Sequence, residues 1–413
     1  MIPRLIILLA LVALISAAPP QRSARGGDIS TSDATAATVT GKPGDTYTFI
    51  RNDLSTLHAR LGAVTSQVVE YLDDSSWSQL KTEDCLALIN ESPPINTATS
   101  LSVLTLNDGQ RFPGEVVSGE TPSADIVAWN HPRLGRLSIP INLIASVTFQ
   151  PGAQIPTSGS SDVLLLSNGD RLEGFILSIA DTISIELSSP AGSTAHQVSH
   201  IPLSRAVAAT MVAQNRPAVG RRIWLEDGTV LDVSTLTVGL DGQVRIASPF
   251  IPQDPQHPVL VPIQNVSAVL LVPRAIVPLA SIKPLDVSGP STRFMIPPPR
   301  VMDAFAPLQA SRISMSGPLK VRYPLPAHSR RFSATASLAR DAQVFGDCDL
   351  VISCDGKELS RTHLSPDQPA AAINVPAAGA EMTIDLMPGA NGSIQDHVIL
   401  SLPIFSIDTS LRQ

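Results

Sequence analysis

The chain has 413 residues, only 16% of them are charged, and its formal net charge is −7. This balance gives no electrostatic reason to expect binding to phosphate backbones or anionic lipid, so it argues against nucleic acid as a partner. The 36 prolines are roughly twice the average share. Because dense proline breaks long helices, we expect an all-β protein of strands and turns, long enough for two to four domains.

A short apolar run opens the chain. Leu5 to Ile15 follows a positive start, Met1-Ile-Pro-Arg4, and ends in Ser16-Ala17-Ala18. An apolar stretch of this length, closed by small residues, predicts a signal peptide over residues 1–18 and is too short to span a bilayer. We therefore expect a secreted, periplasmic or cell-surface protein with no transmembrane segment after signal cleavage; an uncleaved anchor is the alternative. Residues 19–45, rich in Ser, Thr, Ala and Gly, read as a flexible linker.

A motif made of a turn and a later proline then returns three times. The glycines of the three turns are 60 and 59 residues apart, and an Ile-Pro or Val-Pro pair follows each. The copies are Asp108-Gly109 with Ile139-Pro140, Asn168-Gly169 with Ile201-Pro202, and Asp227-Gly228 with Val261-Pro262. Asp-Gly and Asn-Gly supply the positive backbone angles of tight hairpin turns. A fixed period of this size predicts β-repeats, over 99–150, 161–215 and 220–273.

The first two repeats share a second glycine, Gly114 and Gly174. The order of strand, Asp/Asn-Gly, four residues, Gly and strand resembles the first half of the small Sm-like barrels. The resemblance implies tandem small β-barrel-like (Sm/SH3-like) repeats. It does not imply RNA binding, because the loop positions that read RNA in that family have no clear counterpart here. The third repeat has Asp232 and Val233 where the second glycine would fall.

A degenerate copy is predicted before the three, over 46–92. Leu80 to Ile89 resembles the closing strand of the later repeats, and Asn52-Asp53 stands about where the turn should be. Val64 to Leu72 could alternatively form an amphipathic helix with the leucines that precede it. The period favours strand.

The period stops near Leu279, where a different domain begins. Runs of alternating apolar and polar residues return after a proline-rich entry, with turn signals at Asp355-Gly356 and Asn391-Gly392. Alternating strands with turns at intervals predict a β-sandwich over 279–413.

This last third of the chain resembles NPCBM, a carbohydrate-binding module first described alongside glycoside hydrolase family 98. The matching residues follow in order: Ile282-Lys283-Pro284-Leu285, Tyr323-Pro-Leu-Pro, Arg330-Arg331-Phe332-Ser333-Ala334, Asp341, Asp355-Gly356-Lys357-Glu358 and Asp396-His397. Planctomycete-type proteins that join this module to Asn/Asp-Gly β-repeats behind a signal peptide look similar overall. The resemblance implies a jelly-roll-like sandwich of the galactose-binding type that binds a glycan or cell-surface polysaccharide.

Two departures from the family pattern affect the implied site. The aromatic residue expected after Asp-His is replaced by Val398-Ile399-Leu400, and a Gly-Val-His-Ser-like segment reads Gln309-Ala310-Ser311 without its histidine. Sugar modules generally present an aromatic face, because the C–H side of a pyranose packs on a flat ring. All three tryptophans lie outside this domain, which leaves Tyr323 as the best candidate for a stacking surface.

Three further residues complete the predicted carbohydrate site: Arg331, Asp396 and His397. Asp396 and His397 follow a turn, where they either hold a hydroxyl or a cation or fix the last strand. Arg330 and Arg331 begin a strand, so one should point to solvent while the other binds a sugar or pairs with Asp341 or Glu358.

An acidic cluster offers a calcium hypothesis. Asp347, Asp349 and Asp355 supply the carboxylates that Ca²⁺ prefers, although their spacing does not fit the helix-loop-helix calcium motif. A solvated strand edge is the alternative interpretation, and no other cofactor is implied.

Catalytic signatures are missing: the sequence has no His-Glu-x-x-His, no Gly-x-Ser-x-Gly and no Gly-rich phosphate loop. The leading hypothesis is therefore a secreted, non-catalytic protein whose repeats display a glycan-binding module. The alternative is a structural or protein-interaction protein of the cell envelope with no sugar binding. A hydrolase, the third class, would require two carboxylates about 5 to 10 Å apart in one cleft.

Overall fold

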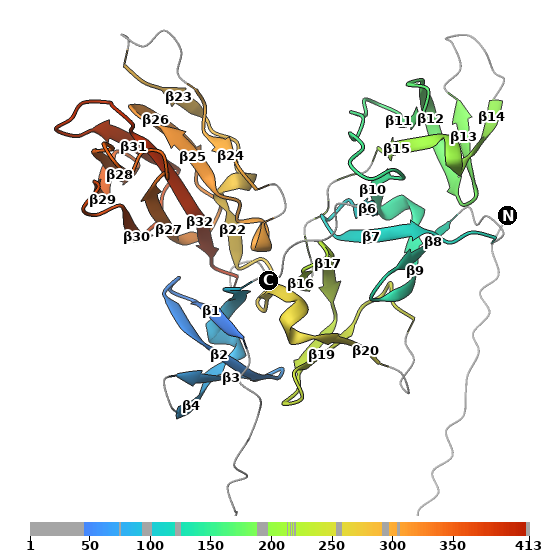
Figure 1. The fold of residues 1–413 in the computed structure, drawn as a ribbon, viewed down its shortest axis with the longest axis horizontal. Helices are drawn as coiled ribbons and strands as arrows, with labels where there is room; N and C mark the ends of the chain where they lie inside the picture. The colour runs from blue at the N-terminus through green and yellow to red at the C-terminus, as the bar shows by residue number, and fades with distance from the viewer. Residues whose placement is uncertain are drawn as a thin grey trace, which may run out of the picture. The chain divides into compact units, whose positions relative to one another are not determined.

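The computed structural model describes residues 45–409, except 74–75, 93–100, 120–124, 188–196, alternate positions between 213 and 219, 253–257, 291–296 and 304–305. The predicted signal peptide and nearly all of the predicted linker lie outside the described residues. Within those residues, strands and short 3-10 helices are the regular structure, as the all-β prediction requires (Figure 1). No helix in this part of the chain is long and apolar enough to cross a membrane.

Four barrel-like units of similar strand order occupy residues 46–270. The first barrel, at the degenerate repeat, has β1 (Thr46–Arg51), β2 (Thr56–Val64), β3 (Val68–Asp73), β4 (Ser76–Lys81), η1 (Thr82–Asp84) and β5 (Cys85–Asn90). The second has β6 (Ser102–Leu106), β7 (Arg111–Val116), β8 (Ile126–His131), β9 (Gly135–Pro140), η3 (Ile141–Leu143) and β10 (Ile144–Thr148). All of these strands fall within the predicted repeat ranges.

The third and fourth barrels repeat this order. The third has β11 (Asp162–Leu166), β12 (Arg171–Ile179), β13 (Thr182–Leu187), β14 (Gln197–Pro202), η4 (Leu203–Arg205) and β15 (Ala206–Thr210). The fourth has β16 (Arg221–Leu225), β17 (Val230–Val233), β18 (Thr235–Val238), β19 (Gln243–Ala247), β20 (Val259–Pro262), η5 (Ile263–Asn265) and β21 (Val266–Leu270). In the first barrel, β2 and β3 cover the segment for which an amphipathic helix was the alternative, so that alternative is wrong.

The repeated motif marks two fixed points of each barrel. The turn glycines Gly109, Gly169 and Gly228 have φ of +85°, +88° and +82°, a region that side chains disfavour. The repeated proline ends the strand before a single 3-10 turn. That turn leads into the closing strand, which pairs with the first strand of its own barrel. The period of the sequence is therefore the length of one closed unit.

The barrels associate in pairs through their closing strands. In the second and third barrels, β10 pairs with β15, with Val147 opposite Ala209. In the first and fourth barrels, β5 pairs with β21, with Leu88 opposite Val269. Two units that are far apart in the sequence thus share a continuous ladder of backbone hydrogen bonds, whereas the first and second barrels share no strand pairing among the described residues.

The C-terminal domain is a sandwich of two sheets. One sheet has the order β24 (Arg300–Val301), β25 (Ile313–Ser316), β32 (His397–Ile407), β27 (Ser329–Leu338) and β30 (Ala370–Pro376), with β22 (Ile276–Pro278) also on β32. The other has β23 (Asp286–Ser288), β26 (Leu319–Pro324), β31 (Glu381–Pro388), β28 (Cys348–Cys354) and β29 (Lys357–Leu364). The sandwich begins at β22, slightly before the predicted boundary at 279, and 3-10 turns η6 (Leu279–Ser281) and η7 (Pro307–Gln309) precede its central strands.

Apolar side chains of both sheets form one core, in which Phe332 and Phe405 lie with ring centroids 5.0 Å apart. A separate apolar cluster joins the sandwich to the first and fourth barrels. It includes Ile50 and Leu86 of the first barrel, Trp224 of the fourth, and Ile404 of β32. The sandwich is therefore packed on the barrels through buried apolar contacts.

Candidate ligand-binding site

The four residues predicted to bind sugar do not form one site. His397 is the first residue of β32, whereas Arg331 lies opposite Ser406 near the other end of that strand. The strand has 11 residues, and at the usual rise its two ends are about 30 Å apart. A single sugar cannot contact both side chains.

Tyr323 is not an exposed stacking surface, so that prediction is wrong. It shares the inward face of β26 with Leu319 and Val321 and is 2% exposed. Burial raises the pKa of its hydroxyl to about 12. The ring lines a depression of about 280 Å³ together with Ile313, Val301 and Lys283. This depression is mainly apolar, and the Lys283 ammonium is the only charged group among its described lining residues.

Asp396 and His397 hold strands together. Asp396 is 3% exposed, and its backbone carbonyl accepts a hydrogen bond from the Gly317 N–H at 2.6 Å. His397 Nε2 lies 2.6 Å from Ser314 Oγ on the neighbouring strand β25, and Nδ1 lies 3.5 Å from Asp341 Oδ1. These contacts match the alternative in which the pair fixes the last strand.

The two arginines have partners other than those expected. Arg331 Nε donates to Asn374 Oδ1 at 2.8 Å, and Asn374 Nδ2 in turn donates to the Asp53 carbonyl of the first barrel at 3.0 Å. Arg330 forms an ion pair with Asp408. The predicted pairing with Asp341 or Glu358 is therefore wrong, because Glu358 is held by Arg361 at 2.8 Å. Asn374, which Arg331 holds, links the sandwich to the first barrel, and Arg330 lines a pocket beside that link.

The acidic residues of the calcium hypothesis do not form one cluster: Asp347 and Asp349 both face His363, at 3.5 and 3.0 Å, whereas Asp355 lies elsewhere. Asp347 precedes β28 and Asp355 follows it, so they are at opposite ends of the strand. The Asp355 carboxylate accepts hydrogen bonds from the N–H groups of Ala380 and Glu381, at 3.0 to 3.2 Å. Across the described ranges, no group of three or more His, Cys, Asp or Glu side chains is arranged to hold a metal ion.

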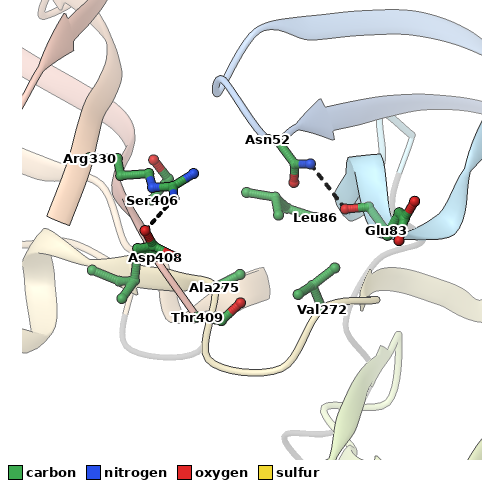
Figure 2. Close-up of a pocket in the computed structure, with 10 residues that line it drawn as sticks. Asn52, Glu83, Leu86, Val272, Ala275, Arg330, Ser406, Asp408 and Thr409 are labelled. Carbon is green, nitrogen blue, oxygen red and sulfur yellow. Dashed lines mark hydrogen bonds and ion pairs between the residues drawn. The ribbon is translucent and has the colours of Figure 1, made fainter. Parts of the chain in front are cut away.

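A pocket of about 240 Å³ lies where the first barrel, the connection between β21 and β22, and the sandwich meet; it is called the junction pocket below. Its lining residues are Asn52, Glu83, Leu86, Val272, Ala275, Arg330, Ser406, Ile407, Asp408 and Thr409. Figure 2 shows Arg330 and Asp408 on one side and Asn52 and Glu83 on the other, with Leu86 between them. Charged and polar groups thus face each other across apolar side chains.

Local structure positions each polar group of the pocket. Asn52 occupies the turn after β1, and its side-chain N–H donates to the Glu83 carbonyl in η1 at 3.0 Å. Arg330 lies in β27 and Asp408 directly follows β32, and their ion pair joins these two neighbouring segments. The Ile407 N–H donates to the Ala275 carbonyl at 2.9 Å, which holds the connection against β32.

Ser406 is the unusual member of this pocket. Ser406 is 3% exposed, and its hydroxyl has no hydrogen-bond partner among the described residues. Leaving a buried hydroxyl unpaired costs roughly 1–3 kcal/mol, so such a group is stabilised by any partner that reaches it. The hydroxyl lies at the wall of a pocket that already offers a guanidinium, an amide and two carboxylates.

The sequence predicts the local structure of parts of this pocket, but it does not predict that they lie together. The sequence predicts a turn at Asn52-Asp53 and the start of a strand at Arg330, but no pattern in it places the two side by side. Asp408 and Ser406 were not singled out, because the end of β32 reads as an ordinary core strand. The missing signal is the packing of the sandwich on the first barrel.

Searches against protein-family models and curated proteins find no match. Among solved structures, the chain is similar to the CBM51 module of a Clostridium perfringens GH95 protein in complex with methyl-galactose, at 10% identity and a TM-score of 0.27, over 32% of this chain and 99% of that one. It is also similar to the tandem CBM51 modules of a family 98 glycoside hydrolase from Streptococcus pneumoniae SP3-BS71, at 10% identity and a TM-score of 0.28, over 87% and 88% of the chains.

A third similar structure combines the M60 catalytic domain with two CBM51 domains of Clostridium perfringens ZmpB, at 10% identity and a TM-score of 0.28, over 88% of this chain. The match spans only 51% of that longer chain. These neighbours contain carbohydrate-binding modules, the class that the sequence resemblance implied.

Proposed function

We propose that this is a secreted, non-catalytic glycan-binding protein and that the junction pocket holds one sugar residue of its ligand. The observation that carries the proposal is the unpaired, buried hydroxyl of Ser406 in a pocket that combines an apolar floor with a polar rim. Leu86, Val272 and Ala275 supply the floor, and the charged groups of Arg330 and Asp408 lie at the rim.

The mixture of groups favours a neutral polyhydroxylated ring over other ligands. A sugar hydroxyl both donates and accepts, so it can satisfy Arg330 and Asn52 as well as the carboxylates of Glu83 and Asp408. An anion would meet two carboxylates, whereas an apolar ligand would leave every rim group without a partner. The C–H face of the ring would cover the apolar floor, as in small-molecule sites generally.

The pocket does not favour hydrolysis. Arg330 occupies the carboxylate of Asp408, whereas a glycoside hydrolase needs two carboxylates available to the scissile bond. We propose that the barrels carry the sandwich and contribute one wall of the site, through Asn52 and Glu83. Binding should not need calcium, because none of the acidic residues of the calcium hypothesis lines this pocket.

A glycan array probed with the full chain, with and without EDTA, tests this proposal, and calorimetry on any retained glycan measures affinity. Ser406→Ala and Arg330→Gln should each weaken binding about tenfold or more, since each removes a hydrogen bond to the ligand. Arg312→Gln is the matched control, because Arg312 also forms an ion pair, with Asp303, elsewhere on the sandwich. An array with no retained glycan, or affinities that are equal in all variants, would contradict the proposal.

Two observations favour a structural or protein-interaction role as the second candidate. The bond from Asn374 to Asp53 and the apolar cluster around Trp224 fix the sandwich to the barrels, as expected if packing were the role of this edge. In that case Ser406→Ala should leave every glycan measurement unchanged. Pull-down from an envelope fraction should then recover the same protein partner with the wild type and with Ser406→Ala.

A further inference from the structure

Another pocket, of about 510 Å³, lies between the second and third barrels and is called the inter-barrel cleft below. Residues of the second barrel and of the turn after β10 line one side: Ser102, Glu115, Val116, Ser118, Trp129, Phe149 and Gln150. Residues of the third barrel line the other: Asp181, Leu203, Ser204 and Ala206. The cleft shares no residue with the junction pocket.

The floor of the cleft is apolar and contains one unpaired donor. Val116 and Trp129 are cross-strand neighbours on β7 and β8, and Phe149, Leu203 and Ala206 complete the surface. Trp129 is fully buried, and its indole N–H has no hydrogen-bond partner among the described residues. A buried N–H of this kind is stabilised by an acceptor, which a bound molecule or water can supply.

The rim of the cleft carries one sign of charge. Glu115 is exposed and forms no ion pair in the described part of the chain. Asp181 uses Oδ2 to accept a hydrogen bond from the Gly119 N–H at 2.8 Å, which fixes its carboxylate at the cleft. No Lys, Arg or His is among the lining residues. Two carboxylates above an apolar floor attract a cation whose stem is hydrocarbon.

We infer that the inter-barrel cleft is a binding site for an alkyl-ammonium group. The ammonium lies between the carboxylates of Glu115 and Asp181, and the aliphatic stem covers Val116 and Phe149. An acceptor on the ligand satisfies the Trp129 indole N–H. Two sources offer this chemistry, a free polyamine and the lysine side chain of a peptide, and they differ in whether a carbonyl acceptor accompanies the amine.

Calorimetry on the full chain at low salt separates these sources. The probes are 1,5-diaminopentane, acetyl-Lys-Lys-amide and, as a neutral isostere, 1,5-pentanediol. The cationic probes should bind and the diol should not, and binding should weaken severalfold between 50 and 300 mM salt. Tighter binding of the peptide identifies lysine side chains as the source, whereas equal or tighter binding of the diamine identifies polyamines. Binding of the diol as tightly as the cations would overturn the inference.

Two pairs of variants locate the binding. Glu115→Gln should weaken cation binding about tenfold, the effect of removing one close charge. Glu173→Gln is its control, since Glu173 is exposed on β12 and does not line the cleft. Trp129→Phe keeps a ring in place and should abolish the ligand-dependent change in tryptophan emission. The control Trp77→Phe removes a tryptophan that is 47% exposed and should keep that change.

If Glu115→Gln and Glu173→Gln weakened cation binding equally, the inferred site would be wrong. Equal effects would mean that only the net charge of the protein matters. Glu115 is at the surface, so its variant tests the site even if Trp129→Phe does not fold. Failure of glycan binding at the junction pocket would leave these results unchanged, because the two sites share no residue.

Discussion

His131 of the second barrel lies with Nε2 2.7 Å from Oγ1 of Thr229 in the fourth barrel, a contact between residues 98 positions apart. The other ring nitrogen, Nδ1, accepts hydrogen bonds from the N–H groups of Arg133 and Leu134, both at 3.1 Å. Nε2 must therefore carry the hydrogen and donate it to Thr229. The Thr229 hydroxyl donates to Asp227 in the repeated Asp-Gly turn. The imidazole is thus a neutral connector between two barrels.

This connector predicts that acid destabilises the protein. Burial lowers the pKa of His131 to about 4, below its ordinary value of 6.5. Between these pH values His131 is protonated in the unfolded chain but neutral in the folded chain. The free energy of unfolding therefore decreases as pH falls from about 6.5 to 4. The expected loss is about 3 kcal/mol.

Urea unfolding at pH 7 and at pH 4.5 measures this loss. His131→Gln should flatten the dependence on pH, even if it lowers stability at both values. His200→Gln replaces an exposed histidine of the third barrel and should keep the wild-type slope. A slope that survives in His131→Gln would refute the assignment.

Arg222 provides a second link between barrels and a second prediction. It is 3% exposed, forms an ion pair with Asp232, and donates to the Asp108 carbonyl of the second barrel at 3.0 Å. Arg222→Met should cost about 3 kcal/mol, because it leaves the partly buried carboxylate of Asp232 without its partner. Arg361→Met, which removes an exposed ion pair with Glu358, should lower the stability much less, because solvent screens this pair. If the two variants lost the same stability in thermal unfolding, the Arg222–Asp232 pair would contribute no more than an exposed ion pair, which would contradict the prediction.

Gly174 predicts a steric effect. A Cβ at this position would lie 2.0 Å from the Glu186 carbonyl oxygen on the neighbouring strand. Gly174→Ala should therefore destabilise the third barrel by about 1–3 kcal/mol, because β12 and β13 must separate. Gly159→Ala is the control, since nothing lies within 4 Å of its Cβ. Denaturant midpoints that shift equally in both variants would contradict the close approach of the strands.

Tyr323 yields a prediction that separates core from site. Tyr323→Phe keeps the buried ring and should change stability by less than about 1.5 kcal/mol. Tyr323→Ala should cost about 3–5 kcal/mol through the cavity it leaves. Neither substitution should alter glycan affinity in protein that remains folded. If Tyr323→Phe lost glycan affinity while its melting temperature stayed unchanged, the prediction would be wrong and Tyr323 would contact the ligand.

The repeats could be predicted from the sequence because their constraints are local. A tight turn needs Asp-Gly or Asn-Gly, and the chain must return to close each barrel after a fixed number of residues. Even the departure in the fourth barrel has a local marker: Asp232 stands where a second glycine was expected, and it pairs with Arg222. The burial of Tyr323 was also readable, since it alternates in step with Leu319 and Val321.

The candidate sites could not be predicted, because they arise between units. The junction pocket brings Asn52 together with Arg330, and the inter-barrel cleft brings Glu115 together with Asp181. The repeat pattern of the sequence does not indicate which barrels pack against each other. The resemblance to a sugar-binding module implies a site within the sandwich, whereas the polar groups of the junction pocket lie where the sandwich meets the first barrel.

The pairing of the first barrel with the fourth means that one edge of the first barrel must wait for its partner during biosynthesis. Ile89 of β5 lies opposite Ala268 of β21, so the partner of this edge is synthesised long after the edge itself. At ordinary rates of translation the interval is on the order of ten seconds or more. During that time the newly made β5 presents an unpaired row of backbone groups, the feature that promotes misassembly between neighbouring chains. Slower elongation between residues 91 and 270 would lengthen this exposure and raise the demand for chaperones.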